Sequence, residues 1–483
     1  MNEDELRQLF ADSADVIIKS YQLGEGSYHQ KFVAMYCEGM TSIDHLEQSV
    51  FPQMQSLMSK QIDRNPSELD LNMMLQFHEI NGSDVMKELT VSLYRGELIF
   101  FFEETNKFYA LDISSPPNRT PEESSTETSI KGPRDGFTES MITNVALVRK
   151  RLLTSSLCCW KIAIGQRSHT MVALLYIGDV IDMNIIEDAK QRLFDIDIDA
   201  LVASSQLEAV LAGREHSFFP LVEITGRPDY VVQSLLRGRF AVVVDGSPMV
   251  LIAPANLTFL LKSPEDIHYP FYYVAFERIL RLGGLVVSSL LPGFWIAVSA
   301  YNIEQIPFPL VATISSSRLG LPISGPMDFI LMLVLFELFR EAGMRLPKSV
   351  GQTVTVVGGL IVGDAAIRAG ITSPTTLVIT SISTISMFTL VNQSLLGTVT
   401  LLRIFVLFAS SIFGIFGFML SLMGIVLYLS TLESFGIPYL APLSPPGFRE
   451  MITAVFAKPW DKIRRRPQML NPNDATRQGD ESS

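Results

Sequence analysis

Two long stretches without a charged side chain dominate the second half of this chain. Residues 282–303 and residues 404–432 contain no Asp, Glu, Lys or Arg over 22 and 29 positions. A helix rises ~1.5 Å per residue, so either stretch can cross the roughly 30 Å hydrocarbon layer of a bilayer. We therefore expect residues 278–432 to form an α-helical transmembrane domain.

Composition and charge divide the chain near the same place. The 483 residues have a mean hydropathy of +0.28 and only 18% charged residues, against about 25% in soluble domains. From position 271 onward there are 12 acidic and 15 basic residues, whereas the preceding positions hold 38 acidic and 23 basic ones. The acidic front half excludes a basic nucleic-acid-binding surface, and the high aliphatic content excludes a disordered chain. No nucleic-acid partner is expected.

The N-terminal residues and the cysteines bear on location. The sequence MNEDELRQLFADSADV is acidic and lacks the basic and apolar regions of a signal peptide. We therefore expect the front half to stay in the cytoplasm. Cys37, Cys158 and Cys159 have neither the number nor the spacing of a disulfide framework or a zinc site. Reduced core thiols are the simplest interpretation, and no metal or cofactor is expected.

The front half alternates short apolar runs with amphipathic segments, which predicts two α/β subdomains. The first is residues 1–113, with a strand at 32–40, a helix at 42–59 and a hairpin of 93–102 and 107–113. Residues 114–136 are rich in Pro, Ser, Thr and Gly, which predicts a linker. The second subdomain is residues 137–270, with a strand at 171–177, helices at 185–194 and 207–211, and a hairpin of 241–244 and 249–252. Asp245 and Gly246 supply the tight turn of that hairpin.

Motifs of catalysis are missing from the sequence. There is no GxGxxG, GxxxxGK[ST] or GxSxG in the front half, and the six histidines are scattered without HExxH spacing. No catalytic residue is predicted, and an enzyme with a membrane anchor is the less favoured alternative. For the front half, a small-molecule-binding domain and a scaffold for assembly both remain open.

The distribution of Lys and Arg selects between two topologies. If residues 349–363 cross the membrane there are five spans, with 6 basic residues on the N-terminal side and 8 on the other. If they are re-entrant there are four spans, with 12 basic residues on the cytoplasmic side and only Arg318 and Arg403 outside. We take the second topology, with spans near 282–301, 327–339, 374–393 and 404–432. Residues 433–483 then form a basic cytoplasmic tail.

The re-entrant segment is rich in glycine and valine. Irregular backbone at membrane depth requires a protein cover or a water-filled cavity, and Gly359 and Gly363 form a GxxxG contact. One interpretation is a tightly packed helix hairpin. The other is a pore lined by copies of the segment, in which valines form an apolar gate that closes by dewetting. The pore or gate candidates are Val354, Val357, Gly358, Gly359, Val362, Gly363 and Asp364.

Three acidic residues lie in or at the edge of the apolar region. Glu337 precedes Arg340 by three positions, so the two can pair on one helix face. Asp328 lies at the start of a predicted span. Asp364 follows the glycine-rich segment and is the better candidate for a cation site at a pore mouth.

Several strings in the chain resemble the A subunit of GerA-type spore germination receptors. The strongest is ELFREAGMRLPKSVGQT at 337–353, followed by VGGLIVG at 357–363. The front half adds GPRDGF at 132–137, RPD at 227–229 and DGSP at 245–248. The family-motif residues are Arg227, Pro228, Asp229, Glu337, Arg340, Glu341, Gly343, Arg345, Pro347, Gly351 and Gln352. Gly226 and Asp364 depart from the family, which usually has Glu and Gln there.

The resemblance implies a function that composition alone does not. Such A subunits reside in the inner membrane of the endospore with a transporter-like B subunit and a lipoprotein C subunit. They sense small nutrients, and the A subunit is thought to oligomerise into a monovalent-cation path. An accessory A-like subunit that amplifies ion release is one alternative. A secondary transporter is another, although no inverted repeat is evident in the sequence.

Overall fold

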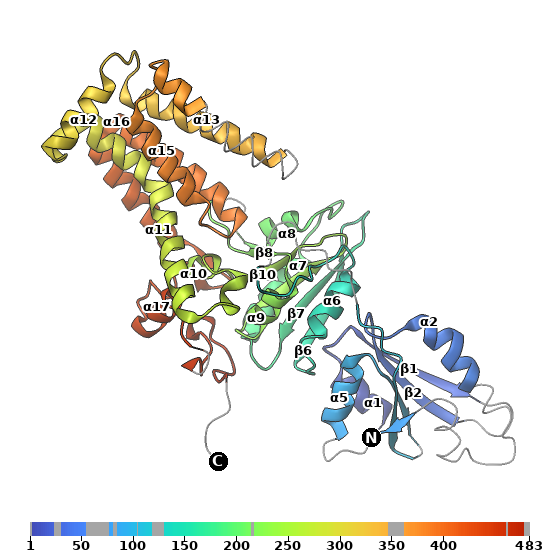
Figure 1. Ribbon diagram of the computed structural model, residues 1–483. Coiled ribbons are helices and arrows are strands. Elements are labelled where there is room, and N and C mark those ends of the chain that lie inside the picture. Colours follow the sequence, from blue (N-terminus) through green and yellow to red (C-terminus); the bar gives the residue numbers. More distant parts are fainter. Residues whose placement is uncertain are drawn as a thin grey trace.

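The structure is a computed structural model of the chain. It describes residues 2–23, 30–54, 77–80, 85–103, 105–117, 130–213, 217–345, 362–459 and 462–477. Figure 1 shows two α/β subdomains, then a bundle of helices, with the C-terminal segment lying back against the second subdomain. An α/β front half followed by a helical second half is therefore confirmed.

The first subdomain is a five-stranded antiparallel sheet with helices on both faces. Its strand order is β1-β2-β4-β5-β3. Alternate residues of β2 face opposite sides, so Val33 joins the cluster under α1 and α5 while Phe32 joins the cluster under α2 and η1. The elements are α1 (Glu3–Leu9), β1 (Val16–Leu23), β2 (Gln30–Cys37), α2 (Ile43–His45), the π-helix η1 (Leu46–Val50), β3 (His78–Glu79), α5 (Val85–Arg95), β4 (Leu98–Phe102) and β5 (Lys107–Leu111).

The predicted strand at 93–102 is wrong in its first part. Residues up to Arg95 complete helix α5, and Gly96 at φ +100° ends that helix. The strand therefore starts only at Leu98. The hairpin partner, β5, lies where the sequence predicts it.

The second subdomain repeats the topology of the first. Its antiparallel sheet has the order β6-β7-β9-β10-β8, which is the same order shifted by five strands. The predicted turn at Asp245 and Gly246 joins β9 to β10, with Gly246 at φ +82°. The elements are α6 (Met141–Arg149), β6 (Leu157–Ile164), β7 (Thr170–Ile177), α7 (Met183–Phe194), α8 (Ser204–Leu211), β8 (Glu223–Thr225), α9 (Pro228–Leu235), β9 (Phe240–Val244), β10 (Val250–Ala253), α10 (Leu257–Leu260) and the 3₁₀ helix η2 (Pro264–Ile267).

A buried ion pair fastens the two subdomains together. Arg149, at the end of α6, donates from Nε and Nη2 to both oxygens of Asp15 at 2.8 and 2.7 Å. Its guanidinium also lies 4.1 Å from the ring centre of Tyr94. Arg149 is 0% exposed and Asp15 is 1% exposed. Beside the pair, Cys37 and Cys159 are buried free thiols, as expected, and burial raises the pKa of each well above its usual range.

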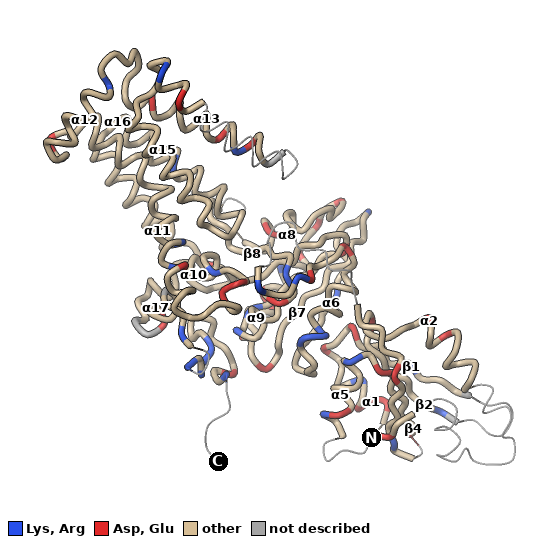
Figure 2. Tube along the Cα trace, in the orientation of Figure 1, with Lys and Arg blue, Asp and Glu red and all other residues tan. Residues whose placement is uncertain are grey.

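Among its described residues, the helical bundle contains two helical stretches long and apolar enough to cross a membrane, Phe271–Tyr301 and Gln393–Thr431. Figure 2 shows few charged residues along α11, α15 and α16. The elements are α11 (Phe271–Ile296), which continues as the π-helix η3 (Ala297–Tyr301), then η4 (Ile303–Gln305), α12 (Phe308–Arg318), α13 (Gly325–Arg345), α15 (Pro374–Met387) and α16 (Gln393–Thr431). Residues 362–368 are also helical.

Helix α16 is two antiparallel arms rather than one rod. The chain reverses at Gly414, whose φ of 59° and ψ of −137° are not helical. Thr398 of the first arm donates to the carbonyl of Phe218 at 2.6 Å, and the hydroxyl of Tyr428 in the second arm accepts from the Phe218 N–H at 3.1 Å. Both arms therefore end at the second subdomain. The prediction of one continuous span over 404–432 is therefore wrong. A sequence without charged residues is compatible both with a helix that continues and with one that folds back, so it did not indicate the reversal.

The direction predicted for the span 374–393 is also reversed. Asn392, just before α16, donates to Glu223 of the second subdomain at 2.7 Å. The start of α15 lies at the other end, where the Ser373 N–H donates to Asp328 at 3.3 Å. Residue 393 and Arg403, placed outside by the charge count, thus lie on the side of the bundle that faces the second subdomain. The pairing with Glu223, which the charge count does not include, sets this direction.

The C-terminal segment returns to the second subdomain. Its elements are β11 (Glu433–Ser434), β12 (Ile437–Pro438), α17 (Phe448–Val455) and η6 (Gln468–Leu470). The N–H of Asn473 donates to the carbonyl of Val180 at 2.9 Å, and Nε of Arg466 donates to the carbonyl of Leu236 at 2.9 Å. The segments before and after the bundle therefore lie together at one end of it.

Substituting Arg149 with Met should strongly destabilise the fold. The variant leaves the Asp15 carboxylate buried without its cation, and breaking a buried pair from one side costs about 3–5 kcal/mol. Thermal unfolding of the full-length chain in detergent measures the loss. Arg167→Gln is the matched control, because its pair with Asp199 is exposed and such pairs contribute about 0–1 kcal/mol. Equal unfolding temperatures for the two variants would contradict this role.

Substituting Gly414 with Ala should destabilise the bundle by about 1–3 kcal/mol, because its backbone angles suit glycine almost alone. The new Cβ would also lie 3.0 Å from Cβ of Tyr301. Gly424→Ala is the control: a Cβ there meets nothing within 4 Å, and Ala favours a helix over Gly by about 1 kcal/mol. Heat denaturation in detergent should lower the midpoint for the first variant only. A fall of the same size in both would refute the turn.

Candidate functional site: charged groups in and below the helical bundle

Glu337 of α13 lies between two arginines inside the bundle. It accepts from Nη2 of Arg340 at 2.7 Å, as the i,i+3 spacing predicts. It also accepts from Nη2 of Arg403 in α16, a contact that the sequence does not predict. Arg340 in turn donates to Oγ1 of Thr400 at 3.2 Å. The cluster thus ties α13 to the first arm of α16.

This cluster carries one more positive charge than negative. Two guanidinium groups share one carboxylate, and Arg403 is 1% exposed. Within the described part of the chain, Nε and Nη1 of Arg403 have no hydrogen-bond partner. Since a surplus positive charge in low-dielectric surroundings repels cations, the cluster holds the helices together and is not itself a cation site.

Asp328, near the start of α13, contributes a negative charge that no basic side chain of the described residues neutralises. It is 1% exposed, and its Oδ2 accepts from Oγ1 of Thr376 at 2.7 Å and from the Ser373 N–H at 3.3 Å. Among the described residues, its Oδ1 and the nearby Oγ1 of Thr372 have no hydrogen-bond partner, and Asp328 makes no ion pair. A buried carboxylate surrounded by hydroxyls favours a hard cation. Asp328 is therefore the described acidic group best suited to attract one.

Close contacts through small residues join α11 to α15 and α16. A Cβ at Gly284 would lie 2.0 Å from Oγ1 of Thr389, and one at Gly293 would lie 2.6 Å from a side-chain atom of α16. Oγ of Ser383 donates to the carbonyl of Ser288 at 3.0 Å, across two helices. Glycine contacts with Ser and Thr hydrogen bonds between helices are the packing used within membranes.

The family-motif residues Arg227, Pro228 and Asp229 lie at the start of α9 in the second subdomain. Arg227 is 2% exposed and donates to both oxygens of Asp229 at 3.1 and 2.8 Å. Its Nη1 donates to Glu265 of η2, whose other oxygen accepts from the Lys131 N–H at 3.0 Å. Pro228 occupies the first turn of α9, where its missing N–H costs nothing. The motif thus fixes η2 to the sheet.

The residue after Glu265 in η2 binds the first helix of the bundle. Asp266 accepts from Nε of Arg278 at 2.9 Å and from Nη1 of Arg281 at 2.8 Å, both on α11. Arg281 also donates to Glu277 at 2.9 Å. Adjacent carboxylates therefore connect the second subdomain on one side and α11 on the other.

The remaining predicted residues are only partly described. Val354, Val357, Gly358, Gly359, Pro347, Gly351 and Gln352 lie outside the described residues, and with them most of the predicted re-entrant segment. Of its flanks, Arg340 contacts Met387 at the end of α15, whereas Gly363 lies against Leu377 in the first turn of α15. These flanks do not lie together at one end of α15, as a return to one face would require.

Three further predicted residues lie on helix surfaces. Asp364 is exposed and pairs with Arg368 at 2.8 Å, one turn later. Val362, in the same helix, is half-buried, and Glu341 of α13 is exposed. Gly343 and Arg345 belong to the last turn of α13. The sequence did not predict the contacts made by Arg403, Glu265 and Asp266. The only sign of them in the sequence is a charged side chain within an apolar stretch or near the start of a helix.

These features define a class of protein: two α/β sheets of one topology, joined through a charged turn to an apolar helical bundle. The sequence matches the family described as Bacillus/Clostridium GerA spore germination protein over residues 4–469. The chain belongs to this family, the A subunits of spore germinant receptors, as the resemblance of its motifs predicts.

Individual relatives agree over almost the full length. The chain is 41% identical to spore germination protein XA of Bacillus anthracis, covering 99% of this chain and 97% of that protein. It is 32% identical to spore germination protein KA of Bacillus subtilis (strain 168), covering 99% and 88%. Among solved structures, it is similar to the N-terminal domain of the A subunit of the Bacillus megaterium spore germinant receptor GerK3. That similarity has 27% identity, covers 52% of this chain and 92% of that chain, and has a TM-score of 0.39.

Substituting Glu337 with Gln should lower the yield and thermal stability of the full-length chain in detergent. Removing the shared carboxylate leaves the buried Arg403 uncompensated, at a cost of about 3–5 kcal/mol. Adding Arg403→Met should recover much of the loss, because the two side chains are directly coupled. Glu304→Gln, in an exposed turn, is the control. A double variant no more stable than Glu337→Gln would argue against the pairing.

Proposed function

We propose that this chain is the A subunit of a nutrient-sensing spore germination receptor. In this proposal it resides in the inner membrane of the endospore, with several helices crossing the bilayer and the α/β subdomains and C-terminal segment on the spore-core side. It acts with a B and a C subunit, self-associates, and forms a gated path for monovalent cations. The observation that carries the proposal is the family match from residue 4 to residue 469.

Exposed apolar side chains on the bundle support a membrane location and contacts with further subunits. Phe405, Phe413 and Phe416 of α16 are 55%, 60% and 67% exposed. Exposing so many large apolar groups to water is unfavourable. Lipid, or another helix within the bilayer, would cover them.

The cation path is proposed to use the glycine-rich segment around 349–363 together with acidic groups at its mouth. Val354, Val357 and Val362 would form the apolar gate, and Asp328 and Asp364 would raise the local cation concentration. The surplus positive charge at Arg403 supports a path that avoids the Glu337 cluster.

Coupling to the soluble part is proposed to run through η2. Glu265 is held by Arg227 and Asp266 is held by α11, so a rotation of the second subdomain would pull on the first helix of the bundle. A nutrient signal from the B subunit could bias the gate through this rigid turn.

Substituting Val362 with Ser should make proteoliposomes leak potassium several-fold faster, because a polar residue wets an apolar constriction. Val357→Ala should act in the same direction. Val378→Ser, on the exposed side of α15, is the matched control and should leave the flux unchanged. Potassium efflux from loaded vesicles gives the measurement. Unaltered flux in both gate variants would remove these valines from the path.

Deleting the gene in its spore-forming host should abolish germination and potassium release for at least one nutrient in a panel of amino acids and sugars. Restoring the gene should restore that response, and complementation with the Val378→Ser variant serves as the control. Normal responses to every nutrient would contradict the receptor role and favour an accessory A-like subunit.

A further inference from the structure

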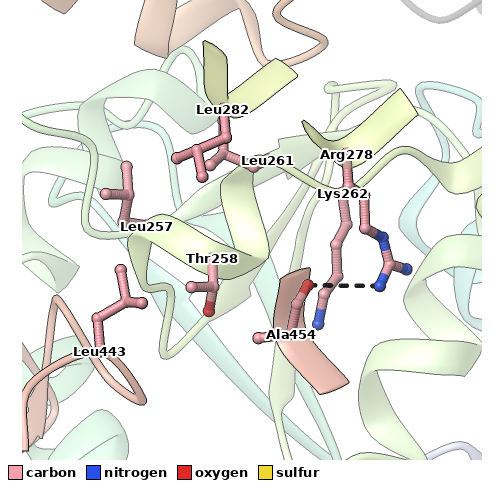
Figure 3. Close-up of a pocket in the computed structure, with 8 residues that line it drawn as sticks. All are labelled: Leu257, Thr258, Leu261, Lys262, Arg278, Leu282, Leu443 and Ala454. Carbon is pink, nitrogen blue, oxygen red and sulfur yellow. Dashed lines mark hydrogen bonds between the residues drawn. The ribbon is translucent and has the colours of Figure 1, made fainter. Parts of the chain in front are cut away.

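Basic side chains gather where α11 leaves the second subdomain, far along the chain from the gate candidates. Lys262 and Arg278 line a small pocket there. Figure 3 shows the two side chains side by side and pointing the same way, with Nη1 of Arg278 donating to the carbonyl of Ala454 at 3.4 Å. The rest of the lining is Leu257, Thr258, Leu261, Leu282, Leu443 and Ala454.

The positive charge around this pocket is not neutralised by the described residues. Asp266 is already shared between Arg278 and Arg281, and neither Lys262 nor Arg237 forms an ion pair within the described ranges. Burial, and after it the charges of Arg237 and Arg278, hold the pKa of Lys262 well below its usual range. Burial also lowers the pKa of Arg237 to about 10. Cations that repel one another in a partly buried site are stabilised by an anion.

The helices beside the pocket expose apolar and aromatic side chains of the kind found at a bilayer surface. The first turns of α11 expose Phe271, Tyr272 and Phe276 at 45%, 67% and 58%. Tyrosine side chains such as that of Tyr272 concentrate at the membrane–water interface, where the ring contacts apolar groups and the hydroxyl contacts water. On the other side of the pocket, α17 exposes Ile452 and is followed by the exposed Phe456, as expected of a helix that lies along the interface. The pocket therefore opens at the depth of lipid headgroups.

We propose that this pocket binds the phosphate group of an anionic phospholipid. The Lys262 ammonium and the Arg278 guanidinium donate charge-assisted hydrogen bonds to the phosphate oxygens. The leucines of the lining contact the glycerol and upper acyl carbons. Free inorganic phosphate would neutralise the same charges but would leave this apolar wall uncovered, so the lipid is the occupant that fits both parts. The site goes beyond the cation path and requires only that α11 enters the bilayer.

The test uses the full-length chain in neutral detergent, with phosphatidylglycerol, phosphatidylcholine or inorganic phosphate added separately. Native mass spectrometry measures retained lipid, and thermal unfolding measures stability. The natural chain should retain phosphatidylglycerol in preference to phosphatidylcholine and gain thermal stability from it. Lys262→Gln should bind phosphatidylglycerol about tenfold more weakly, the effect of one lost charge-assisted hydrogen bond. Without lipid, Lys262→Gln should be at least as stable as the natural chain, because the repulsion is relieved.

Two controls separate the site from general charge effects. Lys19→Gln, on the exposed side of β1, should bind phosphatidylglycerol as the natural chain does, and Lys262→Arg should retain most of the binding. Lys262→Met provides a second reading if Lys262→Gln does not fold. Equal retention of phosphatidylglycerol by the natural chain and by these two Lys262 variants would overturn the proposal. So would stabilisation by inorganic phosphate without any preference for phosphatidylglycerol. None of these readouts depends on ion flux, so failure here is distinct from failure of the receptor proposal.

Discussion

Asp266 holds two arginines of α11 at 2.8 and 2.9 Å, and the arrangement of the whole molecule depends on this junction. Apolar contacts alone do not fix the angle at which a helix leaves a sheet. Charge-assisted hydrogen bonds have a preferred geometry and therefore fix that angle. Because Glu265, one residue earlier, is held by the buried Arg227, the sheet, the 3₁₀ turn and the first helix of the bundle behave as one connected piece.

The sequence predicted those features that depend on local pattern. Charge-free runs located the helical half, a short apolar run located the strand β7, and Asp245 with Gly246 located the hairpin turn. Features that depend on contacts between distant residues could not be predicted in this way. Arg403 lies between two predicted spans and was therefore expected in a loop, whereas it pairs with the distant Glu337 inside the bundle. The direction of α15 follows from the hydrogen bond between Asn392 and Glu223. The positive-inside count treats every arginine as exposed, and so it misplaced one that is buried.

The two front subdomains share one strand order, although no repeat is visible in the amino-acid sequence. Strand order is set by which apolar faces must be covered, and many different apolar residues can cover them. The two copies are not independent, because the buried pair of Arg149 with Asp15 and the backbone bonds between Asp12, Ala14 and Cys159 join them. A rigid double sheet of this kind can carry a displacement from its outer part to η2.

The reversal at Gly414 determines where the C-terminal segment lies. A stretch of 29 uncharged residues, as one straight helix, would place whatever follows it at the far end of the bundle. Folded into a pair of arms, it brings the C-terminal segment back to the end at which the first arm begins. The docking of Asn473 and Arg466 on the second subdomain therefore follows from this one turn.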